Sequence, residues 1–84
     1  MKKREIIVGT VSESDTHFLA EAVQTASRYK STLHISVRNA QVNLKSIMGM
    51  MTLGLIKGDT AVIEAEGIDE DEAIEGISAF LGQV

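Results

Sequence analysis

The sequence contains no cysteine, no proline and no tryptophan, and its aromatic residues are two phenylalanines and one tyrosine. Without cysteine, neither a disulfide nor a thiolate metal site can hold the chain together, so burial and hydrogen bonding must do so. Long hydrophobic runs are absent as well. The apolar run that follows the basic start covers only residues 6–8, which is too short for a signal peptide or a membrane span. We therefore expect a cytoplasmic protein without a membrane segment.

The chain also lacks an excess of positive charge, since 8 Lys and Arg residues face 12 Asp and Glu residues, for a net charge of −4. Non-specific nucleic-acid binding needs a basic surface, so direct binding to nucleic acid is not expected. Neither a Ser/His/Asp constellation nor a glycine-rich phosphate loop occurs, and we expect no enzyme activity and no cofactor. A length of 84 residues with 44% apolar content predicts one domain, residues 1–84, with a modest core.

The first half of the chain alternates between strand and helix patterns. Residues 5–11 are rich in β-branched side chains and indicate a strand, and residues 16–29 have the apolar spacing of an amphipathic helix. Residues 32–37 alternate as in a half-buried strand, and residues 38–41 predict a hairpin turn into a short return strand over residues 42–44. The buried face of the helix is predicted to hold Leu19, Ala22, Val23 and Ala26.

The second half repeats this alternation. Residues 46–53 are apolar and rich in methionine, and they predict a short helix that ends at Gly54. After a turn at residues 57–59, the alternation of residues 61–66 predicts a fourth strand.

The last element is predicted to be a helix that begins in an acidic segment, residues 69–72. Asp69 and Glu72 have the spacing of a capping box. The resulting order, βαββαβα, predicts an α+β open-faced sandwich in which helices cover one face of a four-stranded antiparallel sheet, with a split βαβ arrangement. The buried stripe of this helix is predicted to consist of Ala73, Ile74, Ile77, Leu81 and Val84.

Three segments of the chain resemble HPr, the phosphocarrier protein family of the sugar phosphotransferase system. The most specific is VNLKSIMGMMTLG at residues 42–54, which resembles the regulatory-serine segment of the family. The others are VQTASRY at residues 23–29 and the glycine and acidic run at residues 67–73. The resemblance covers the whole chain without gaps and implies the HPr-like fold.

The phosphoacceptor motif of the family, His-Ala-Arg-Pro, is not matched. Counted back without gaps from Gln24, its four places hold Asp15, Thr16, His17 and Phe18. The chain is thus similar to the Crh-type members, which lack the active histidine and keep the regulatory serine. A gapped alignment would make His17 the acceptor. It would delete two helix residues, however, and rotate the predicted buried face by about half a turn.

Two readings are open for Asp15 and for His17. Asp15 is a solvated carboxylate at a helix start, or it places a permanent negative charge where HPr carries a transient phosphoryl group. His17 is an exposed residue of the first turn, or it is a fallback phosphoacceptor. With Asp15 it provides only two metal ligands, so no metal site is predicted. The resemblance implies that both residues belong to the partner-binding surface.

Ser46 precedes the short helix and can be read either as an N-cap or as a phosphorylation site. A cap serine is worth about 1 kcal/mol. The family resemblance implies regulatory phosphorylation, and a phosphate at this place would face free backbone N–H groups and the positive end of the helix. The adjacent Lys45 is expected to add a weak attraction.

The short helix is too small to bury every apolar side chain that it carries. Met50 is predicted to be in the core, because methionine fills irregular gaps. Ile47, Met48 and Met51 are predicted to form part of an exposed docking surface, together with Asp15, His17, Lys45 and Ser46, as the resemblance implies.

Three functions are compatible with these features. The first is a regulatory module of carbon catabolite repression, phosphorylated at Ser46 by HPr kinase/phosphorylase and then bound by a catabolite-control transcription regulator. The second is a phosphocarrier that passes phosphoryl groups between phosphotransferase-system proteins through His17. The third is a degenerate HPr-like scaffold. The missing acceptor motif favours the first over the second, and the intact serine segment favours it over the third.

Overall fold

The computed structural model describes residues 1–9 and 16–82. The order βαββαβα is confirmed over these residues. Strands and helices follow in the order β1 (Lys2–Ile7), α1 (Thr16–Ser27), β2 (Thr32–Val37), β3 (Ala40–Asn43), α2 (Ile47–Leu53), β4 (Thr60–Glu66) and α3 (Glu70–Leu81).

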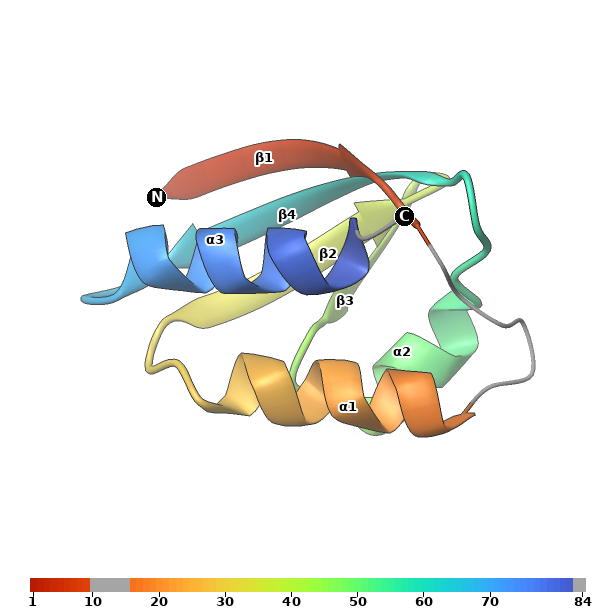
Figure 1. Ribbon diagram of the computed structural model, residues 1–84, viewed down its shortest axis with the longest axis horizontal. Coiled ribbons are helices and arrows are strands. Elements are labelled where there is room, and N and C mark those ends of the chain that lie inside the picture. The colour runs from red at the N-terminus through yellow and green to blue at the C-terminus, as the bar shows by residue number, and fades with distance from the viewer. Residues whose placement is uncertain (10–15, 83–84) are drawn as a thin grey trace.

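The strands form one antiparallel sheet in the order β1-β4-β2-β3. β4 lies between β1 and β2, which therefore run parallel to each other, and α1 connects them. This is the predicted split βαβ arrangement. The three labelled helices lie on one face of the sheet, and no described element covers the other face (Figure 1). The predicted open-faced sandwich is therefore confirmed.

The core lies between the sheet and the helices. β2 and β4 are paired so that Ile35 lies opposite Ile63, and both side chains are fully buried. Because side chains alternate along a strand, the inward row of each strand is apolar and the other row is partly exposed. In α3 the predicted stripe is confirmed at Ala73, Ile74, Ile77 and Leu81, whereas Val84 lies outside the described residues.

The predicted buried face of α1 does contact the core, but only two of its four residues are fully buried. Ala22 and Ala26 are fully buried, whereas Leu19 and Val23 are only half-buried against the core. α1 contacts both α2 and α3. At the edge of this face, Phe18 stacks on Phe80 of α3 with ring centroids 5.1 Å apart.

The first strand begins and ends earlier than predicted. β1 covers Lys2–Ile7 instead of residues 5–11, and Thr10 and Val11 lie outside the described residues. Its basic start was not recognised as strand because charged side chains do not mark a buried face. At the edge of a sheet, however, the backbone can pair while most side chains stay exposed, as they do here.

The hairpin between β2 and β3 is tighter than predicted. Its loop consists of Arg38 and Asn39 alone, with φ angles of 49° and 67°, and Val37 pairs directly with Ala40. Two successive positive φ angles are typical of a type I′ turn, whose twist matches that of the flanking strands. The predicted turn residues at 40 and 41 therefore belong to β3.

The capping box predicted at the start of α3 is wrong. The Asp69 carboxylate makes no cap hydrogen bond within α3. It accepts instead from the backbone N–H groups of Lys30 and Ser31, at 2.8 and 2.9 Å, and from the Ser31 hydroxyl. Asp69 therefore ties the connection before β2 to the start of α3. The Ser31 hydroxyl and then the Lys30 N–H hold the pKa of this carboxyl below its ordinary value.

Replacing Asp69 with Asn should lower stability to urea near neutral pH and have a smaller effect in acid. The carboxylate has a lowered pKa in the folded state, so its contribution is present above the ordinary pKa of about 4 and is lost as the pH falls through the folded value. The urea midpoints of wild type and Asp69→Asn should therefore converge below about pH 4. Asp71→Asn, at an exposed position in the same helical turn, controls for the loss of a carboxylate. A constant difference across pH would contradict this role of Asp69.

Candidate functional site

The start of α2 is fixed by Ser46. Its backbone is extended, with φ −106° and ψ 114°, and its hydroxyl accepts a hydrogen bond of 3.1 Å from the Gly49 N–H. The Ser46 N–H donates to the Asn43 carbonyl, and the Asn43 side chain accepts from the Lys45 N–H at 2.8 Å. Ser46 is thus an N-cap, held by the turn that leaves β3, and its side chain is partly exposed.

Gly49 allows the first turn of α2 to lie close to β3. A Cβ atom at this position would be 3.3 Å from the Cβ of Val42 and 3.4 Å from the Ser46 side chain. The distance to Val42 is tighter than ordinary van der Waals contact, and the distance to Ser46 is at its lower limit. Glycine at residue 49 therefore favours the close approach of α2 to Val42 of β3.

The other end of α2 is held by a side chain from the hairpin. Gly54 ends the helix in the left-handed conformation, with φ 64°, as predicted. The Arg38 guanidinium donates to the carbonyls of Leu53 and Gly54, each at 2.9 Å, and forms an ion pair with Asp59. A cation at this end also suits the helix dipole. The Arg38 hydrogen bond is the main cause that lowers the pKa of the Asp59 carboxyl.

Between these two ends, α2 exposes a row of apolar side chains. Ile47 is 38% exposed, Met48 76% and Met51 53%, and we call these three residues the α2 patch. Met50 of the same helix is fully buried, as predicted. The sequence therefore correctly separated the methionine that fills the core from the two that face outward.

His17 lies on the surface at the beginning of α1. Its side chain is 81% exposed, and its Nε2 atom is 2.5 Å from Oε1 of Glu21, one helical turn later. Figure 1 shows α2 beside the first half of α1, and the two helices are in contact. His17 and the α2 patch thus belong to neighbouring helices. Asp15, the other candidate at this place, lies outside the described residues.

Lys45 is less available than its position in the sequence suggested. Its ammonium group donates a 2.8 Å hydrogen bond to the Tyr29 carbonyl, just beyond the end of α1, and the contact is partly buried. In this conformation the charge of Lys45 serves the packing of α1 against the β3–α2 turn.

Among residues 1–9 and 16–82, no group of three His, Asp or Glu side chains is placed to hold a metal ion. No helix in the same part of the chain is long and apolar enough to cross a membrane.

Comparison with known proteins gives consistent matches over the whole chain. The family model described as the PTS HPr component phosphorylation site matches residues 2–83. The phosphocarrier protein HPr from Bacillus anthracis is 31% identical, with a TM-score of 0.90 and 95% of each chain covered. HPr from Thermoanaerobacter tengcongensis is 36% identical, with a TM-score of 0.86 over 100% of this chain and 99% of that one.

A solved structure of the second type of family member matches as well. Crh, the catabolite repression protein from Bacillus subtilis, is 33% identical, with a TM-score of 0.73 over 89% of this chain and 82% of that one. The solved structures that match therefore include both HPr and Crh, and both share the fold of this chain. The chain belongs to the HPr family of phosphocarrier proteins.

Proposed function

We propose that this protein is a Crh-like regulator of carbon catabolite control, phosphorylated at Ser46 and then bound by a transcription regulator. The observation that carries the proposal is the start of α2, where a partly exposed capping serine directly precedes the α2 patch. The second support is the sequence itself, which has no histidine at the acceptor place of the family. The proposal includes a cytoplasmic location.

A phosphate on Ser46 is compatible with the local structure. The hydroxyl already accepts from the Gly49 N–H, so phosphate oxygens would meet backbone donors at the positive end of a helix. Ser46 is partly exposed, which leaves it open to approach by a kinase. HPr kinase/phosphorylase is the enzyme that we propose for this step.

The partner surface would combine charge and apolar contact. The phosphate supplies strong charge-assisted acceptors for basic side chains, and the α2 patch beside it supplies apolar area. The Lys45 ammonium donates a hydrogen bond to the Tyr29 carbonyl, and the phosphate therefore keeps acceptor oxygens for the partner. A regulator with a basic and apolar surface is therefore the partner that we propose.

Phosphotransfer through His17 is the second candidate, and the exposure of this side chain is the observation in its favour. Its Nε2 atom, however, faces the carboxylate of Glu21 at 2.5 Å. A phosphoryl group on this nitrogen would meet a negative charge one helical turn away. The geometry therefore favours the regulatory function over carrier activity.

Incubation with enzyme I and phosphoenolpyruvate should leave the protein without a useful amount of acid-labile phosphate. The reason is the absence of histidine at the acceptor place and the carboxylate beside His17. Intact-mass analysis gives the readout, with HPr kinase/phosphorylase and ATP as the parallel reaction, in which wild type but not Ser46→Ala should gain one phosphate. A phosphohistidine at His17, absent from His17→Gln, would support the carrier function instead.

A further inference from the structure

The sulfur chemistry of this protein is confined to methionine, because the chain has four methionines and no cysteine. Three of the four lie on α2 and differ in exposure. Met48 is 76% exposed and Met51 53%, whereas Met50 is fully buried. An oxidant dissolved in water therefore reaches the side chains of Met48 and Met51 directly, and it reaches Met50 only when the fold opens. Both accessible methionines of α2 belong to the α2 patch.

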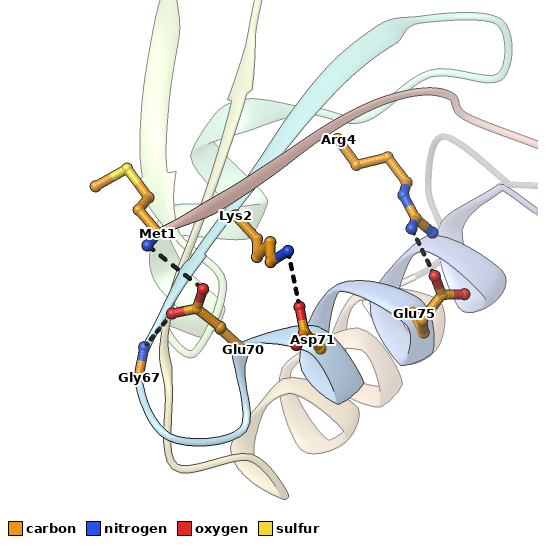
Figure 2. A network of polar contacts seen from close by, with 7 residues as sticks. All are labelled: Met1, Lys2, Arg4, Gly67, Glu70, Asp71 and Glu75. Atoms are coloured by element: carbon orange, nitrogen blue, oxygen red, sulfur yellow. Dashed lines mark hydrogen bonds and ion pairs between the residues drawn. The ribbon is translucent and has the colours of Figure 1, made fainter.

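The fourth methionine is exposed as well but lies elsewhere on the molecule. Met1 is 66% exposed, and its amino group lies 3.4 Å from the Glu70 carboxylate at the start of α3 (Figure 2). Figure 1 shows this end of β1 far from α2. The chain therefore contains its own references for the two methionines of the α2 patch, one exposed methionine outside the patch and one buried methionine on the same helix.

Oxidation of Met48 and Met51 would change the chemistry of the α2 patch. It converts a flexible apolar thioether into a polar sulfoxide. While the patch is exposed, water solvates the sulfoxide oxygen, so the fold should lose little stability. A partner that covers the patch removes this water, and a covered oxygen without a donor weakens the complex. Because the two residues are three positions apart on one helix, one partner would cover both.

We propose that Met48 and Met51 form a reversible oxidation site, at which a peroxide lowers the affinity of the α2 patch for its regulator. This inference rests on the proposed function, since the regulator is the partner whose binding changes. It adds a second signal of opposite sign to the phosphate on Ser46. The Ser46 hydroxyl bonds to the Gly49 N–H and not to either methionine, so both modifications can be present on one molecule.

The oxidation step is balanced with hydrogen peroxide as the oxidant. The thioether sulfur donates an electron pair to one peroxide oxygen, the O–O bond breaks and an S–O bond forms. The proton of the transferred oxygen joins the leaving hydroxide as water, so the sulfur loses two electrons and the peroxide gains them. A methionine sulfoxide reductase reverses the step, with one enzyme for each sulfoxide epimer. It takes two electrons from a dithiol, which becomes a disulfide, and the oxygen leaves as water.

Peroxide treatment of the phosphorylated protein tests both the site and its effect. Peptide mapping by mass spectrometry should find one added oxygen on Met1, Met48 and Met51 at similar rates, and on Met50 at least about tenfold more slowly. Calorimetric titration should show that the Kd for the regulator rises about tenfold when the patch is oxidised. Treatment with both reductases and dithiothreitol should restore the original Kd. Urea unfolding before and after oxidation separates this effect from a loss of fold.

Variants identify which sulfur atoms are responsible. The double variant Met48→Leu/Met51→Leu has no oxidisable side chain in the α2 patch, so peroxide should leave its Kd unchanged, whatever that Kd is. Met50→Leu is the matched control on the same helix and should keep the full response to peroxide. Met48→Gln/Met51→Gln carries polar side chains of similar length, and it should bind the regulator weakly without any peroxide.

Protection by the bound regulator provides a test that needs no variant. Because oxidation and binding oppose each other, excess regulator should slow the oxidation of Met48 and Met51 but not of Met1. No binding by the unoxidised phosphorylated protein would contradict the proposed function, and the oxidation switch with it. Normal binding that oxidation of Met48 and Met51 leaves unchanged would overturn the switch alone. So would a peroxide effect that persists in Met48→Leu/Met51→Leu.

Discussion

Phosphorylation of Ser46 should raise the affinity of this protein for a catabolite-control transcription regulator by roughly 10- to 100-fold. This is the size expected when a phosphate adds a charge-assisted contact to basic side chains of the partner, at about 1.5–3 kcal/mol. The phosphate carries a charge of about −1.5 to −2 and three acceptor oxygens at the edge of the α2 patch. Met48 and Met51 already provide exposed apolar area there.

Calorimetric titration of the regulator with unmodified, phosphorylated and Ser46→Ala protein measures this effect. Ser46→Ala should show the low affinity of the unmodified protein after kinase treatment. It removes the cap hydrogen bond to Gly49, which should lower stability by about 1 kcal/mol and leave the fold intact. Ser46→Asp should raise affinity only partly, because a carboxylate has less charge and fewer acceptor oxygens. Equal affinity for all forms would remove the case for a Ser46 switch and favour the scaffold function.

The fold was predictable because its signals are local and periodic. The alternation of β2 and β4 and the apolar stripe of α3 each identify an element whose buried face is marked in the sequence. β1 shows where this logic ends. Its start is charged and exposed, and it forms a strand because its backbone pairs with the edge of β4. The side chains of residues 2–4 carry no pattern that predicts this pairing.

Half of the candidate site was predictable for the same reason. Ser46 as a cap, Gly54 as a stop and the different exposures of Met48 and Met50 follow from the pattern of one short helix. The contacts that hold this helix come from elsewhere. Arg38, treated as a turn residue, reaches the end of α2 from 15 residues away in sequence. The sequence alone could not predict this contact, because it does not show that the hairpin and the end of α2 are neighbours.

Polar side chains with several possible partners were the hardest to predict. Asp69 has the spacing of a cap but bonds to Lys30 and Ser31, which are 39 and 38 residues away in sequence. Lys45 stands beside Ser46 but bonds to the Tyr29 carbonyl. In both cases the side chain bonds to a backbone group from a distant part of the chain and not to the neighbouring residue that its position suggested. Backbone N–H and carbonyl groups that are shielded from water lower stability when they have no hydrogen-bond partner. Asp69 and Lys45 supply such partners to the connection between α1 and β2.

Truncating the methionines of α2 should separate stability from binding. Met50 is fully buried, so Met50→Ala should lower the free energy of unfolding by about 2–5 kcal/mol through lost contacts and the cavity left behind. Met48 and Met51 are 76% and 53% exposed, so Met48→Ala and Met51→Ala should change stability by about 0.5 kcal/mol or less. Because the three changes are identical and lie on one helix, differences in helix propensity cancel. Urea unfolding measures all three.

The same variants test the α2 patch as a docking surface. If the regulator covers the patch, Met48→Ala and Met51→Ala should each weaken its binding to the phosphorylated protein by about 1 kcal/mol or more, roughly fivefold in Kd. Thr52→Ala serves as a matched control, because Thr52 is exposed on the same helix and its hydroxyl donates to the Met48 carbonyl within α2. Unchanged binding in both methionine variants would remove the patch from the interface. A loss of stability as large as that of Met50→Ala would instead mean that the patch supports the core.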